Sequence, residues 1–189
     1  MTTMTPSLRL TPGGQLRPAT GAWRVNEDYS HATFHARVAG RTVRGRLPLT
    51  GRVVIADRIE DSTALLAAMA GEVSTGSPVL DRLLEGPGFL EAGAFPEITF
   101  RSELLAFVPD GWRAVGRLQL KGAEHELACQ LDLHRGAEPP DGPPRFRIAS
   151  RWVIDSRWVT RHPILAMSRR IPMTCSFLLE PAFNATGVP

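Results

Sequence analysis

Apolar and polar residues alternate along most of this chain, in short runs separated by turn-forming residues. An alternation with a period of two places every second side chain on the same face of a β-strand. The stretch "GWRAVGRLQLKG", residues 111–122, shows this well. Its inward-type positions are Trp112, Ala114, Gly116, Leu118 and Leu120. The pattern predicts a strand with one apolar face.

Five further runs have the same alternation: residues 32–40, 51–57, 125–134, 145–154 and 171–180. Turn-forming sequences lie between several of them, at Pro109–Gly111, Lys121–Glu124 and Gly136–Pro144. Such turns connect antiparallel neighbours. Seven or eight short strands with almost no helix predict an all-β fold, either an antiparallel barrel or a sandwich.

One short helix is predicted between Ser77 and Gly86. Ser77 can cap the helix, Pro78 suits its first position, and Gly86 with the following proline ends it. Leu80, Leu83 and Leu84 form its apolar stripe. The preceding segment, residues 60–76, is rich in Ala and Leu and favours a helix by composition, but its periodicity does not decide between helix and strand.

Size and composition indicate one soluble globular domain, with 189 residues, 43% hydrophobic and 22% charged. A net charge of +3 does not point to nucleic acid, because the cations are scattered among 19 acidic residues. Lys121 is the only lysine. We therefore expect no nucleic-acid partner.

The ends of the chain differ in composition from its centre. Residues 1–20 are rich in Thr, Pro and Gly and are predicted to be a flexible leader, followed by a domain at 21–183 and a tail at 184–189. The leader lacks the apolar run of a secretory signal, and no window approaches the ~20 apolar residues of a membrane span. We expect a cytoplasmic protein without an integral membrane segment, in which Cys129 and Cys175 stay reduced and buried.

Motifs for catalysis or metal binding are not found. The sequence lacks a nucleophile elbow, a phosphate-binding loop and a dinucleotide fingerprint. On a strand, His31 and His35 would lie ~13 Å apart, too far to share one metal ion. His125, His134 and His162 are interpreted as exposed turn residues, and Asp81 with Arg82 or Asp155 with Arg157 as structural charges. We expect no enzyme activity and no metal site.

Several motifs follow one another in a recognisable order and spacing. They are Trp23, Asn26, Tyr29-Ser30 and Phe34, then "RGRL" at 44–47, Thr75-Gly76, Asp81 to Leu84, Phe89-Leu90, Phe95-Pro96, Ile98 to Ser102, and "GRLQLKG" at 116–122. From about Trp23 to Phe183 the chain resembles the YceI-like family of lipocalin-like, polyisoprenoid-binding proteins. It departs from the family pattern at Asn26, Tyr29, Val38 and Gln119, which stand where the family has Asp, His, His and Thr.

The resemblance implies an eight-stranded antiparallel lipocalin-like barrel with a short helical insertion, and it places residues 63–76 on a strand. It further implies a non-catalytic protein that binds, sequesters or transports an apolar isoprenoid-type lipid, a polyisoprenoid or a quinone, as ligand and not as a cofactor. It is also compatible with a homodimer. The predicted lining of the interior consists of Phe34, Ile98, Phe100, Trp112, Leu118, Leu120, Leu131, Phe146, Ile148, Trp152 and Phe177.

Two alternatives remain open at this level. The same apolar residues could simply fill the barrel as packed core, because eight strands enclose a space that side chains alone can occupy. The pocket could also belong to an enzyme or accessory protein of a small-molecule pathway. For such an enzyme, Tyr29 is the titratable candidate that the sequence offers.

Overall fold

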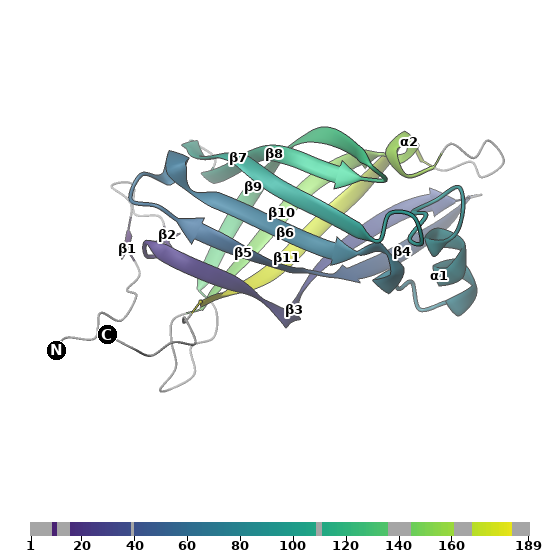
Figure 1. Cartoon of the computed structure of the whole chain (residues 1–189), viewed down its shortest axis with the longest axis horizontal. Helices are drawn as coiled ribbons and strands as arrows, with labels where there is room; N and C mark the ends of the chain where they lie inside the picture. The colour runs from purple at the N-terminus through teal and green to yellow at the C-terminus, as the bar shows by residue number, and fades with distance from the viewer. Residues whose placement is uncertain are drawn as a thin grey trace.

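The computed structural model of the protein describes residues 9–10, 16–38, 40–108, 111–135, 145–160 and 168–182. Long antiparallel strands curve around a common interior, and the helices are short (Figure 1). The strands are β1 Arg9–Leu10, β2 Leu16–Arg17, β3 Gly21–Val38, β4 Arg41–Pro48, β5 Thr50–Ile55, β6 Thr63–Met69, β7 Glu97–Val108, β8 Gly111–Leu120, β9 Ala123–Arg135, β10 Phe146–Asp155 and β11 Arg170–Pro181. The helices are η1 Ile59–Asp61, η2 Ala70–Glu72, α1 Pro78–Glu85 and α2 Ser156–Val159.

The main sheet closes on itself. From β5 to β11 each strand pairs with the next along the chain, and β11 then pairs with β3. The strand β3 pairs with β5 through residues 21–24 and with β4 through residues 31–38, so β4 and β5 together occupy one position. The result is a closed eight-stranded antiparallel barrel, which confirms the predicted fold and excludes the sandwich. β1 and β2 form a separate two-stranded sheet.

Ser30 holds β3 where that strand changes partner. Opposite β11, Asn26 pairs with Leu178 and His31 with Ser176, so the register shifts between these pairs. The fully buried Ser30 hydroxyl accepts a hydrogen bond from the Leu178 amide at 3.0 Å, and its carbonyl accepts one from the Leu49 amide at 3.1 Å. This serine of the Tyr29-Ser30 motif thus has a structural role, because it satisfies backbone groups that the shift would otherwise leave unpaired.

The predicted alternation is confirmed strand by strand. All five inward-type positions of β8, from Trp112 to Leu120, are buried, and the outward Arg113 and Arg117 are exposed. Gly116 allows β7 and β8 to pair, because a Cβ atom there would collide with the backbone carbonyl of Arg101. Near the start of the barrel, Trp23 packs edge-on against Phe146, with ring centroids 5.0 Å apart.

The structure confirms the position of the predicted helix, but the contacts of its side chains differ from those predicted. Helix α1 begins at Pro78 and ends before Gly86 as predicted, but the Ser77 side chain makes no capping hydrogen bond. The Asp81 carboxylate instead accepts bonds from the amide and hydroxyl of Thr75, at 2.7 and 2.6 Å. The prediction of a buried leucine stripe is wrong for Leu83, which is 43% exposed; Leu84 is buried. A helix lying across one end of a barrel buries only a narrow line of side chains.

The segment of undecided periodicity is a strand. Residues Thr63–Met69 form β6 between β5 and β7, and Ala70–Glu72 follow as a single 3-10 turn. Its alanine- and leucine-rich composition favours a helix, yet the ladders on both sides satisfy its backbone. The strand implied by the family resemblance is confirmed for residues 63–69, where tertiary context overrides local propensity, but it is wrong for residues 70–76, which lie outside β6.

The chain boundaries differ slightly from those drawn on the sequence. Pro18 and Ala19 are buried, and the Arg17 guanidinium donates to the carbonyls of Ala56 and Asp57 at 2.6 and 2.7 Å. The last residues of the predicted leader therefore pack against the barrel. The Lys121–Gly122 turn is present; the loop at 136–144 and the tail at 184–189 lie outside the described residues.

Candidate ligand-binding cavity

The barrel encloses a large apolar cavity. Its empty volume, including the part open to solvent, is about 1020 Å³. All eight strand positions contribute side chains, and none of these is charged. The residues on its wall are Pro18, Ala32, Leu49, Val53, Ile55, Ile59, Ala64, Leu66, Ala67, Ile98, Phe100, Leu105, Trp112, Ala114, Leu118, Leu127, Cys129, Leu131, Leu133, Ile148, Ser150, Trp152, Cys175 and Phe177.

A second, smaller cavity lies toward the helical end of the barrel, with an empty volume of about 560 Å³. Leu84 of α1, Val73 and Leu90 cover it from that end, and the rest of its wall comes from the barrel strands and α2. Every residue around it is apolar. The helical insertion therefore closes this end of the barrel with hydrocarbon side chains.

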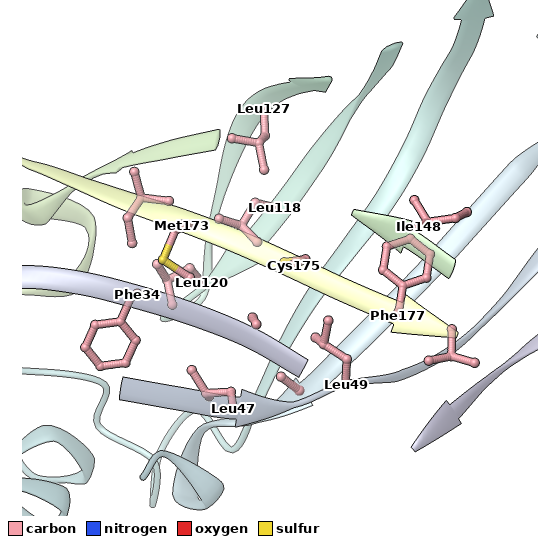
Figure 2. Packing of buried hydrophobic residues seen from close by; sticks show 14 of the residues in the cluster. Phe34, Leu47, Leu49, Leu118, Leu120, Leu127, Ile148, Met173, Cys175 and Phe177 are labelled. Carbon is pink, nitrogen blue, oxygen red and sulfur yellow. The ribbon is translucent and has the colours of Figure 1, made fainter. Parts of the chain in front are cut away.

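Three residues, Ile98, Leu118 and Trp152, line both cavities. They form a wall between the two spaces, to which Trp152 contributes the largest side chain. Figure 2 shows the two ends of this interior, with Phe34, Leu120 and Met173 near one another and Phe177 beside Ile148 farther along β11.

Ten of the eleven predicted lining residues lie on these walls. Phe100, Trp112, Leu131, Ile148 and Phe177 line the large cavity, Phe34 and Leu120 line the small one, and the three shared residues line both. Phe146 lies on neither wall. It is fully buried against Trp23, so packing accounts for its inward position. Whether the other ten contact a ligand stays a prediction.

Several lining residues were not predicted from the sequence. Val53 and Ile55 have the inward alternation of β5 and could have been included on that signal. Leu105 could not, because a register shift between Ser102 and Leu104 changes the parity of β7, so Ser102 and then Leu105 are buried. Periodicity alone does not locate such a bulge.

The polar groups of the large cavity are few and uncharged. Cys129 and Cys175 lie on β9 and β11, and Ser150 is the Cα partner of Cys175 on the intervening strand β10. Burial raises the pKa of both thiols to about 11. Both cysteines are free, as expected, and at neutral pH they are protonated and present only weak hydrogen-bonding groups to the cavity.

Three of the positions where the sequence departs from the family pattern, Asn26, Tyr29 and Gln119, lie outside the cavities. Tyr29 is 56% exposed, so the candidate group for an enzyme does not reach either cavity. Asn26 donates a hydrogen bond to the buried carboxylate of Glu180 at 3.0 Å. Gln119, although half-buried, is on neither wall. These three substitutions leave the composition of the cavity walls unchanged.

The other histidines and charged residues considered as candidates for chemistry make structural contacts. His125 is not an exposed turn residue as expected; it lies half-buried on β9, stacked on Trp158 with ring centroids 4.1 Å apart. His134 is exposed but also lies on β9. Arg157 binds Asp155 at 2.7 Å, and this hydrogen bond lowers the pKa of the carboxyl.

The described residues contain no group of three or more His, Cys, Asp or Glu side chains that could hold a metal ion. Among the same residues, no helix is long and apolar enough to cross a membrane.

Comparison with solved structures shows the same fold in several bacterial proteins. BcnA from Burkholderia cenocepacia is similar with a TM-score of 0.66 and 13% identity, covering 82% of this chain and 98% of that one. A polyisoprenoid-binding domain from Saccharophagus degradans, implicated in plant cell wall breakdown, has a TM-score of 0.59 and 15% identity, with coverage of 84% and 98%. The YceI protein of Campylobacter jejuni has a TM-score of 0.58 and 15% identity, with coverage of 73% and 85%.

No curated protein is significantly similar to the chain in sequence. The family model for the YceI-like domain matches residues 23–159, which include the barrel strands from β3 to β10 and the helical insertion between β6 and β7. This match spans most of the chain. The protein therefore belongs to the YceI-like family.

Proposed function

We propose that this protein binds and carries one apolar, isoprenoid-type chain inside the barrel. The observation that carries the proposal is the uncharged cavity of about 1020 Å³. A polar substrate would lose its hydration there and gain few hydrogen bonds in return, whereas each CH₂ group removed from water contributes roughly 0.8 kcal/mol. The polyisoprenoid-binding domain with the same fold supports this ligand class.

The geometry also favours binding over catalysis. Among the described residues, those on the cavity walls include no carboxylate, histidine or cation, and the two thiols that reach the large cavity have raised pKa values. General acid–base catalysis requires a group that titrates near the working pH. The proposed role is therefore sequestration or transport, with affinity determined by the length and shape of the apolar chain.

An uptake assay tests the proposal. Purified protein is examined by native mass spectrometry, and released material is extracted and identified; the delipidated protein is then titrated with farnesol and longer prenols. We expect a bound apolar molecule, or uptake of prenol with one molecule per chain. Protein that is empty as purified and takes up none of the prenols contradicts the proposal.

A pair of neighbouring substitutions locates the site. Ala114 is buried on the wall of the large cavity, whereas Arg113 beside it points outward. Ala114→Phe fills part of the cavity and should abolish uptake, at a stability cost of roughly 1–3 kcal/mol. Arg113→Phe adds the same ring outside and should leave uptake unchanged. Circular dichroism shows whether both variants keep the fold.

A further inference from the structure

The outer surface of one half of the barrel has a strongly one-sided charge. This half consists of β4, residues 31–38 of β3, residues 146–153 of β10 and residues 170–176 of β11, and we call its outward side the cationic face. The four segments contain seven arginines and two histidines but no aspartate or glutamate. Six of the arginines, Arg37, Arg44, Arg46, Arg147, Arg151 and Arg170, occupy outward positions, whereas Arg41 has the parity of the inward residues of β4. At the edge of the face, Arg170 pairs with Asp155 of β10.

Strand pairing brings these side chains together. Thr33 on β3 pairs with Arg46 on β4 and with Thr174 on β11, which in turn pairs with Arg151 on β10. These four residues form one row across the sheet. At a strand spacing of about 4.8 Å the row is roughly 14 Å long. Along β3, His35 lies next to this row and pairs with Arg44.

The residues between the arginines are short. Thr33, Thr174, Ser176 and Ala149 occupy outward positions at the middle of the face. Arg147 reaches across β11 and donates a hydrogen bond to the Ser176 hydroxyl at 3.2 Å. The arginine side chains therefore project from a part of the sheet whose other outward side chains are small.

Most of this charge is not neutralised within the described residues. Arg151 forms an ion pair with Asp132 of β9 at 3.5 Å, and both side chains are largely exposed. The other six arginines form no ion pair with the described residues. Burial and then the charges of Arg46 and Arg147 lower the pKa of His31, which lies among them. The lowered pKa of His31 thus indicates a positive electrostatic potential at this surface.

The opposite half of the barrel has balanced charge. Strands β5 to β9 contain the five arginines Arg52, Arg101, Arg113, Arg117 and Arg135, and the five carboxylates Glu97, Glu103, Glu124, Glu126 and Asp132. Arg117 pairs with Glu103 across β7 and β8 at 3.1 Å. The excess of positive charge is therefore a property of one side of the barrel and not of its whole surface.

We propose that the cationic face binds the anionic headgroups of a phospholipid bilayer. An array of outward guanidinium groups suits a surface of phosphates, since arginine binds phosphate oxygens in a bidentate manner. Each basic residue close to an anionic membrane strengthens binding roughly fivefold. Docking at a membrane would also place the barrel where apolar chains are found, although the face is independent of what the cavity holds.

The same observations argue against nucleic acid as the partner. Single strands are bound by aromatic side chains on which bases stack, and the outward positions of the four segments carry none. Sequence-reading proteins place a helix or a β-ribbon in the major groove of a duplex. Among the described residues, the cationic face is made of strands and carries no helix.

Vesicle sedimentation tests the proposal. The full-length protein is mixed with vesicles of phosphatidylcholine alone or of phosphatidylcholine with phosphatidylglycerol, at low and high salt. We expect binding only to the anionic vesicles, and weaker binding at high salt. Arg44→Gln with Arg46→Gln should reduce the vesicle affinity about thirtyfold, because two charges leave the face. The matched control, Arg101→Gln with Arg113→Gln, removes two exposed arginines from the opposite half and should retain the wild-type affinity.

Three results would overturn the proposal: no binding to anionic vesicles, an equal loss in both double variants, or binding of a duplex oligonucleotide through Arg44 and Arg46 without vesicle binding. Circular dichroism of each variant excludes unfolding as the cause. The Ala114→Phe variant separates this proposal from the proposed function. It should lose prenol uptake while still sedimenting with anionic vesicles.

Discussion

The inner and outer surfaces of the same strands differ sharply in chemistry. On β10, Ile148, Ser150 and Trp152 line an uncharged cavity, whereas Arg147 and Arg151 project from the opposite side into a cationic face. Neighbouring residues of this strand therefore face opposite environments, an uncharged cavity on the inside and a surface with excess positive charge on the outside. This comparison shows that the effect of a substitution depends on which face of the strand the residue occupies, rather than on its position along the chain.

The largest expected effect comes from putting a charge inside. Phe100→Asp would place a carboxylate on the cavity wall with no cation to pair with it. We expect destabilisation on the order of 3 kcal/mol or more, together with loss of ligand uptake. Chemical denaturation and prenol titration measure both. Arg101→Asp, one residue along and exposed, serves as the control and should stay folded. A stable Phe100→Asp protein with undiminished prenol uptake would contradict the proposed difference between the inner and outer surfaces of the barrel.

A second effect concerns the reactivity of the buried thiols. Because burial raises the pKa of Cys129 and Cys175 from 9.0 to about 11, their thiolate fraction falls about a hundredfold. Native protein should therefore react with iodoacetamide at least that much more slowly than a free thiol at mildly alkaline pH. In Thr174→Cys, the neighbouring outward position should react at an ordinary rate. Mass spectrometry follows both reactions, and equal rates would show that the interior is accessible to water.

A substitution at the wall between the cavities should change stability less, and it should also change the selectivity for ligand chain length. Trp152→Leu removes the largest of the three shared side chains. We expect a loss of roughly 1–3 kcal/mol in unfolding free energy. Affinity for prenols should continue to rise at chain lengths where the wild-type affinity has reached its plateau. An unchanged plateau in a folded variant would show that Trp152 does not limit chain length.

The smallest effect is expected on the outer face. His31 has a lowered pKa, so the folded state binds fewer protons than the unfolded state, and stability should fall slightly as the pH drops below the ordinary histidine value of 6.5. NMR titration measures this pKa. Arg46→Gln should raise it only partway, because burial is the larger cause. A pKa that does not move in Arg46→Gln would contradict a positive potential at the cationic face.

Much of the barrel could be predicted from local pattern. The alternation of β8 and β11 identified inward residues because a strand repeats every two residues whatever its neighbours are. The ends of α1 followed from Pro78 and Gly86 in the same local way. Local pattern failed at β6, where sheet pairing overrode helix-favouring composition, and at Leu105, where a bulge changed the parity of β7.

The candidate site was predicted less completely than the fold. Ten inward residues were correctly placed on cavity walls, but the same reasoning included Phe146, because packed core and cavity lining share one apolar signature. Tyr29 was considered as a pocket group, yet the structure exposes it at the register shift of β3.

The sequence by itself determined most of the strands, the inward face of those without a bulge, and the family, since these depend on neighbouring residues and on motif order. Only the tertiary structure decided that the interior is divided in two by Trp152, Ile98 and Leu118, which come from three different strands. It also gathered arginines that are scattered along the chain onto one side of the barrel. Both features depend on strand register and barrel closure, which bring together residues far apart in sequence.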